Sequence, residues 1–172
     1  LQQKSSFLEG KLGEKIASEK FTLIDDPLLA RGLGTRWYDG DGIAAKERTM
    51  IEKGVLQNYY IDDYYGKKLE MEPTTGSTSN LIVKPGKLSL DDLTKQIAKG
   101  ILITGFIGGN SNSTTGDFSF GIMGFLIENG KITKPVNEMN ISGNAKTFWT
   151  QLAEVGNDPY EYSSWRMPSL LF

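Results

Sequence analysis

The stretch T-T-G-D-F-S-F-G-I-M-G-F-L-I-E-N-G-K-I-T-K-P-V-N-E-M-N-I-S-G-N, Thr114–Asn144, organises the rest of the chain. Its two long arms flank Asn129-Gly130, a dipeptide that supplies the two positive-φ residues of a tight type I′ hairpin. The first arm, Phe118 to Ile127, has apolar residues on both alternations, so we expect it to be buried on both faces. The second arm mixes lysines with apolar residues, which predicts a solvated outer side.

A tract rich in Gly, Ser, Thr and Asn, Gly108–Gly116, stands ahead of this hairpin. Such a tract either brings backbone close to a ligand or forms a mobile loop. Asp117 follows it at the mouth of the first arm, where it either orients a ligand or closes an Asx-turn. The junction therefore supplies the candidate binding residues, which are Thr115, Gly116, Asp117, Phe118 and Ser119.

Length and composition narrow the class of protein. The chain has 172 residues, which fits one domain, and its 20 glycines favour a strand-rich fold with many turns. Its 19 basic and 21 acidic side chains leave a net charge of −2, which does not favour nucleic acid as a direct partner. No apolar run is long enough to cross a bilayer and no signal-peptide pattern opens the chain, so we expect a cytoplasmic protein that does not contact membranes.

Cysteine and histidine are both absent. This excludes disulfides, thiolate catalysis, a histidine general base and Cys- or His-based metal sites within these residues. Any chemistry here must use carboxylates, Lys, Tyr, Ser or Thr. Because the chain opens at Leu1 without a methionine, we expect a fragment of a longer parent, with all 172 residues forming one C-terminal domain.

Periodicity and capping signals predict a mixed α+β domain that is predominantly β. We expect a strongly curved antiparallel or mixed sheet, or a partial barrel, with two main packed helices. The predicted helices are a short one, Asp62–Leu69, and two longer ones, Ser89–Lys99 and Ala145–Val155. Besides the long hairpin, the predicted strands are Phe21–Asp25, a hairpin of Ile43–Met50 with Gly54–Ile61, Leu81–Val83, Ile101–Ile107 and Trp165–Phe172.

Adjacent acids occur three times, as Asp25/Asp26, Asp62/Asp63 and Asp91/Asp92. Neighbours on a strand point to opposite faces, and acids at helix starts serve as caps or face the helix dipole, so we interpret all three pairs as structural. The D-G-D-G run at residues 39–42 has the first two acids of a calcium loop. Ile43 stands where a third acid is needed, which favours an ordinary turn.

Several motifs then follow one another in a recognisable order. They are K-S-S-F-L (4–8), G-D-G-I-A (40–44), I-E-K-G-V-L (51–56), K-K-L-E-M-E-P-T-T-G (67–76), T-G-D-F-S-F-G (115–121), G-F-L-I-E-N-G-K-I-T-K-P-V (124–136), I-S-G-N (141–144) and V-G-N-D (155–158). Together they resemble the C-terminal domain of the TldD/PmbA family, across nearly the whole chain. The first motif and the G-D-F-S run look more like the PmbA (TldE) half of that family.

The resemblance implies a bacterial or archaeal cytoplasmic protein of a family described as modulators of DNA gyrase. In that family, TldD-type and PmbA-type subunits pair in a zinc metallopeptidase that trims peptides, including a microcin precursor and an antitoxin. It also implies a β-rich, barrel-like C-terminal domain that helps to enclose a cavity. Thr115–Ser119 become candidate peptide-binding residues on this basis.

The resemblance implies that this chain supplies none of the family's zinc ligands. The family's HExxxH helix would precede Leu1, and its cysteine ligand falls around Arg166 or Met167, neither of which replaces a thiolate. We therefore expect no cofactor in this chain and zinc only in a TldD-type partner. The expected partners are a TldD-like subunit or a second copy of the chain, and a peptide.

Two other classes of function stay open. An assembly or modulator domain without substrate contact would present exposed aromatic side chains from Trp37, Tyr38 and the Tyr59–Tyr65 group. A stand-alone hydrolase would need two carboxylates from different elements to converge in one pocket.

Overall fold

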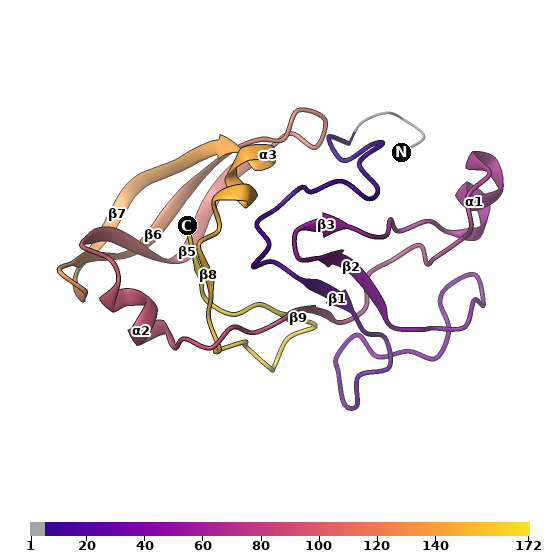
Figure 1. Cartoon of the computed structure of the whole chain (residues 1–172), viewed down its shortest axis with the longest axis horizontal. Coiled ribbons are helices and arrows are strands. Elements are labelled where there is room, and N and C mark those ends of the chain that lie inside the picture. The colour runs from indigo at the N-terminus through magenta and orange to yellow at the C-terminus, as the bar shows by residue number, and fades with distance from the viewer. Residues whose placement is uncertain (1–5) are drawn as a thin grey trace.

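The computed structural model describes residues 6–172 and shows a chain dominated by strands (Figure 1). Its helices are α1 (Asp63–Leu69), α2 (Leu90–Lys95) and α3 (Ala145–Phe148), the last continued by a 3₁₀ turn, Trp149–Gln151. Its strands are β1 (Leu23–Asp25), β2 (Arg48–Glu52), β3 (Val55–Leu56), β4 (Leu81–Val83), β5 (Lys99–Ser111), β6 (Asp117–Glu128), β7 (Lys131–Asn144), β8 (Glu154–Val155), β9 (Trp165–Arg166) and β10 (Leu170–Leu171).

These strands form three sheets. One has five strands in the order β3-β2-β1-β4-β9, in which only the β4–β9 pair is parallel. A second pairs β10 with β8, and the third is the long antiparallel sheet β5-β6-β7. The predominantly β, α+β class is thus confirmed, and the sheets remain open rather than closing into a barrel.

The long hairpin forms as predicted. Asn129 and Gly130 both have positive φ, and Glu128 lies opposite Lys131 at the start of the β6–β7 ladder. The hairpin tip docks on the end of α2, because the N–H groups of Asn129 and Gly130 donate to the carbonyls of Ala98 and Ile97. Helix α2 ends at Lys95 and not at Lys99, because Lys99 is already the first residue of β5 and pairs with Glu128.

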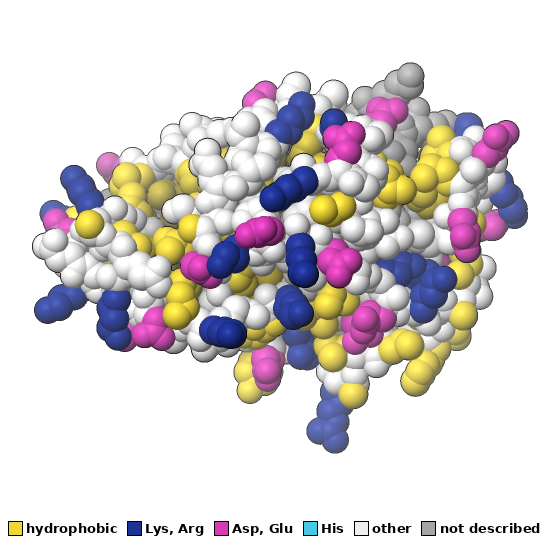
Figure 2. All heavy atoms as spheres, in the orientation of Figure 1, with side chains coloured by type: hydrophobic (Ala, Val, Ile, Leu, Met, Phe, Trp, Pro, Cys, Tyr) yellow, Lys and Arg dark blue, Asp and Glu magenta, His cyan; other side chains and the backbone are white. Residues whose placement is uncertain are grey.

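The expectation that the first arm is buried on both faces is wrong. Met123 is 44% exposed and Phe125 is 37% exposed, whereas Ile122 and Ile127 are buried. Successive residues of a strand point to opposite faces, so Met123 and Phe125 share a face that lies open at one end of the molecule. Figure 2 shows apolar side chains over this sheet, and charges of both signs interspersed elsewhere on the visible face.

A chain of aromatic contacts connects β6 to the rest of the molecule. Phe118 contacts Phe148, with ring centroids 5.4 Å apart, and Phe148 stacks on Phe172 at 4.0 Å. Trp149 then reaches Phe21 at 4.8 Å. Phe21 belongs to the main core, whose buried members are Ala17, Phe21, Val83, Leu152 and Val155. These aromatic contacts therefore anchor the start of the hairpin to the core, in addition to the attachment at its tip.

Two predicted elements near the C-terminus are shorter than expected. The helix predicted over Ala145–Val155 ends in the 3₁₀ turn because its last residues become β8, which pairs with β10. The strand predicted over Trp165–Phe172 splits into β9 and β10, which lie in different sheets with Pro168 between them. Among the described residues, no helix has the length and apolar character needed to cross a membrane.

Candidate functional site

The five candidate residues join the turn that precedes β6 to the first three residues of that strand. The side chain of Asp117 accepts hydrogen bonds from the Thr115 hydroxyl and from the Asn144 amide, both at 2.7 Å. These two bonds lower the pKa of the Asp117 carboxyl below its ordinary value. The carbonyl of Gly116 accepts from the backbone N–H of Ala145, so the turn is fastened to the start of α3. No Asx-turn forms at Asp117 itself; the side chain that accepts from the backbone of this turn is that of Asn112, whose Oδ1 accepts from the N–H groups of Thr114 and Thr115.

Backbone pairing limits how a ligand could reach this turn. Asp117, Phe118 and Ser119 lie on the central strand, with β5 and β7 on either side, so strand addition at β6 itself is excluded. Thr115, Asp117 and Ser119 are exposed, Phe118 is half-buried and Gly116 is buried. A ligand would therefore meet the side chains of the three exposed residues.

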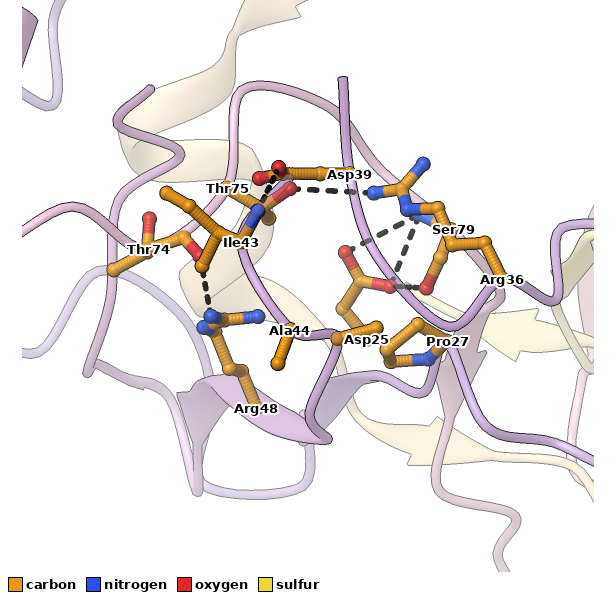
Figure 3. A pocket seen from close by; sticks show the side chains of 11 residues that line it. Asp25, Pro27, Arg36, Asp39, Ile43, Ala44, Arg48, Thr74, Thr75 and Ser79 are labelled. Atoms are coloured by element: carbon orange, nitrogen blue, oxygen red, sulfur yellow. Dashed lines mark hydrogen bonds between the residues drawn. The ribbon is translucent and has the colours of Figure 1, made fainter. Parts of the chain in front are cut away.

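A second polar region lies where β1 ends and β2 begins in the five-stranded sheet (Figure 3). It combines two acids with two arginines around a small cavity of about 10 Å³. Asp25 is 3% exposed, and its carboxylate accepts hydrogen bonds from the backbone N–H and the hydroxyl of Ser79. Asp39 is 9% exposed, and its Oδ1 accepts from the backbone N–H groups of Asp41 and Ile43.

The two arginines of this cluster bind carbonyl and hydroxyl groups. Arg36 donates to the carbonyls of Thr78 and Ser77 and to the Thr75 hydroxyl. Arg48 donates to the carbonyls of Lys46 and Thr74. Neither guanidinium is in an ion pair with a described residue. Asp25 and Asp39 approach one cavity from different elements, but Ser79 and the turn at Asp41 and Ile43 hold them, so the pair is not set up like the two free carboxyls of a hydrolase.

Protonation of Asp39 provides a pH prediction. Burial by itself would raise the pKa of this carboxyl, but the N–H groups of Ile43 and Asp41, the Thr75 hydroxyl and the charge of Arg36 together hold it below its ordinary 3.8. A depressed folded-state pKa means that Asp39 stabilises the fold above the unfolded-state pKa, and that this stabilisation is lost as the pH falls through the folded value. The free-energy difference between wild type and Asp39→Asn should therefore be largest at pH 7 and shrink below about pH 4.

Urea unfolding at a series of pH values measures this difference. Asp41→Asn is the matched control, because Asp41 is an exposed acid in the same turn. A difference for Asp39→Asn that stays constant from neutral to acidic pH would contradict the prediction.

A groove of about 610 Å³ lies on the other side of Arg48. Three segments of the chain line it. They are residues 46–49, residues 57–61 with Tyr60 left out, and residues 71–74. Leu12 of the N-terminal segment stands at its rim, and the same segment is fastened to the groove because the Tyr59 hydroxyl bonds to the backbone of Leu8 and Lys11. A volume of this size is typical of ligand sites.

Sequence reasoning missed the groove and the charged cluster. Their residues come from stretches far apart in the chain, and only the folding of the five-stranded sheet brings them together. The P-T-T-G motif at 73–76 was the one available signal, since Thr74 binds Arg48 and Thr75 binds Arg36.

The residues present do not fit a zinc ion. The chain has no His or Cys, and within residues 6–172 no three acids gather in a way that could hold a metal. At the position where the resemblance puts a cysteine ligand, Arg166 lies in β9 and Met167 packs against the main core.

Comparison with known proteins decides the family. Residues 1–172 match the family model of the PmbA/TldA metallopeptidase C-terminal domain. The chain belongs to this family. Among its relatives, the PmbA metalloprotease homolog of Haemophilus influenzae is 36% identical over 99% of this chain and 39% of its own length, and the PmbA metalloprotease of Escherichia coli O157:H7 is 34% identical over 91% and 35%.

Solved structures agree with this family assignment. A protein of Bacteroides thetaiotaomicron, described as a proposed modulator of DNA gyrase, superposes with a TM-score of 0.96 and 54% identity over 99% of this chain and 39% of its own. TldE of Thermococcus kodakarensis superposes with a TM-score of 0.90 and 28% identity, over 98% and 42%. This PmbA/TldD domain therefore spans well under half the length of these relatives.

Proposed function

We propose that this domain belongs to a PmbA-type subunit that works beside a TldD-type subunit in a peptide-trimming metallopeptidase, and that it contacts the peptide without binding the zinc. The observation that carries the proposal is a PmbA/TldD domain whose sequence lacks both histidine and cysteine. A subunit of this kind supplies walls, subunit contacts and peptide-positioning groups, while the zinc and its activated water belong to the partner.

Within this proposal, the turn Thr115–Ser119 is the first candidate contact. Its exposed hydroxyls and the Asp117 carboxylate lie beside the Gly-rich end of β5. Replacing Asp117 by Asn in a reconstituted two-subunit complex should lower kcat/KM for peptide cleavage by about fivefold, because one charged acceptor is lost. The measurement is a steady-state assay on the complex, with the thermal midpoint of each variant determined in parallel.

Glu128→Gln is the matched control for this variant. Glu128 lies at the opposite end of the same strand and also accepts a hydrogen bond from a threonine hydroxyl, that of Thr133. An unchanged cleavage rate for Asp117→Asn, or for a Gly116 variant that still folds, would remove the turn from the peptide site.

A second candidate function is favoured by the exposure of aromatic side chains. Trp37 is 75% exposed and Tyr38 is 67% exposed, on a loop that Arg36 and Asp39 hold in place. Exposed, well-held aromatic side chains are typical anchors of protein–protein contacts. If the domain serves only in assembly, Trp37→Ala should abolish capture of the partner subunit in a pull-down. A turn variant such as Asp117→Asn should then leave peptide cleavage unchanged. Tyr59 is unsuited to this test, because its hydroxyl is tied to Leu8 and Lys11.

A further inference from the structure

The polar side chains of the turn at Asp117 already have hydrogen-bond partners, and so do the buried polar side chains of the groove beside Arg48. At the turn, Thr115, Asp117 and Asn144 satisfy one another. In the groove, the buried polar groups are likewise engaged: Arg48 bonds to two carbonyls and the Asn58 amide donates to the carbonyl of Thr49. These engaged groups fix the shape of the groove.

Four long polar side chains at the groove make no hydrogen bond or ion pair with any described residue. They are Lys46, Glu47, Gln57 and Glu72. Apolar groups also line the groove, chiefly Ile61, which is 4% exposed, together with Met71 and Pro73. The groove thus combines a fixed, partly apolar floor with a rim of free, flexible groups that includes one cation, two carboxylates and one amide.

This combination favours an extended polypeptide over a small polar ligand. A small polar ligand is oriented by a few buried polar groups that converge on it, and here such groups are already engaged. An extended chain offers amides and varied side chains at regular intervals, and a mixed-charge rim with an apolar floor complements those groups.

We propose that the groove lined by residues 46–49, 57–61 and 71–74 receives an extended segment of the peptide substrate. This inference rests on the proposed function and deepens it by giving the subunit a peptide-holding surface distinct from the turn Thr115–Ser119. Arg48 lines both this surface and the charged cluster, and its hydrogen bond to the carbonyl of Thr74 makes Thr74 a positioning residue for one wall.

Site-specific photo-crosslinking in the reconstituted two-subunit complex tests the groove directly. A benzophenone amino acid is installed at Gln57 or Glu72, and at exposed Lys84 as the control, and each complex is irradiated with a tryptic digest of casein. Peptide adducts at the two groove positions should exceed those at Lys84 by about tenfold. Equal yields at all three positions, or adducts only with other parts of the complex itself, would overturn the proposal.

A kinetic test separates failure of the groove from failure of the proposed function. Gln57→Ala combined with Glu72→Ala should raise KM for peptide cleavage by about fivefold with kcat little changed, because both residues bind substrate remote from the zinc. If cleavage requires this subunit but the double variant has an unchanged KM, the groove proposal is wrong and the proposed function stands. If cleavage proceeds equally without the subunit, the proposed function is wrong.

Discussion

Replacing Asp25 by alanine should lower the free energy of unfolding by about 2–4 kcal/mol, the largest loss expected from any single acidic residue of the chain. Asp25 is 3% exposed and accepts hydrogen bonds from both the N–H and the hydroxyl of Ser79. Removing the carboxylate leaves two buried donors without a partner, and each such donor costs about 1–3 kcal/mol. Urea unfolding followed by circular dichroism measures the loss.

Asp26 is the matched control, since it is the same residue type at the next position. It is less buried, and its Oδ1 accepts only the backbone N–H of Leu28. Asp26→Ala should cost about 1 kcal/mol or less. Equal losses for the two variants would show that the buried contacts of Asp25 do not stabilise the fold in the way described.

A comparable loss is expected at Gly124, in the middle of β6. A Cβ atom added there would overlap the carbonyl oxygen of Leu102 on the neighbouring strand. Backbone cannot move aside as a flexible side chain does, so Gly124→Ala should push β5 and β6 apart and cost about 3 kcal/mol. Thermal unfolding of the variant, together with amide exchange along β5, would report both effects.

Gly105→Ala provides the comparison within the same sheet. A Cβ atom at Gly105 would lie 3.2 Å from Cγ of Met123, which is partly exposed and able to change rotamer. This variant should lose no more than about 1 kcal/mol. If Gly105→Ala proves as damaging as Gly124→Ala, the close backbone approach at Leu102 is not what requires glycine.

Local signals in the sequence predicted the elements whose form depends on neighbouring residues. Asn129-Gly130 predicted the hairpin turn, and the helix starts predicted at Asp62, Ser89 and Ala145 all lie within one residue of those observed. In each case the turn or cap involves atoms within a few residues, so the sequence carries all the necessary information. The same local chemistry explains why the adjacent acids act as caps and hydrogen-bond acceptors.

The lengths of elements depended on distant partners and were predicted less well. Helix α2 ends early because Lys99 pairs with β6 as the start of β5, and α3 ends early because Glu154 and Val155 pair with β10. The exposure of Met123 and Phe125 could not be predicted from the sequence either. A strand with apolar residues on both alternations is predicted to be buried on both faces, whether or not another element covers them.

The sequence by itself determined the family, the predominantly β class and the absence of histidine and cysteine from these 172 residues, because ordered motifs and residue types are properties of the chain. Only the tertiary structure decided which polar groups are free to bind anything. It showed that Asp117 is engaged by Thr115 and Asn144, and that the groove beside Arg48 has free polar groups at its rim. Hydrogen-bond satisfaction depends on residues far apart in sequence, so no reading of the chain alone could have distinguished the two sites.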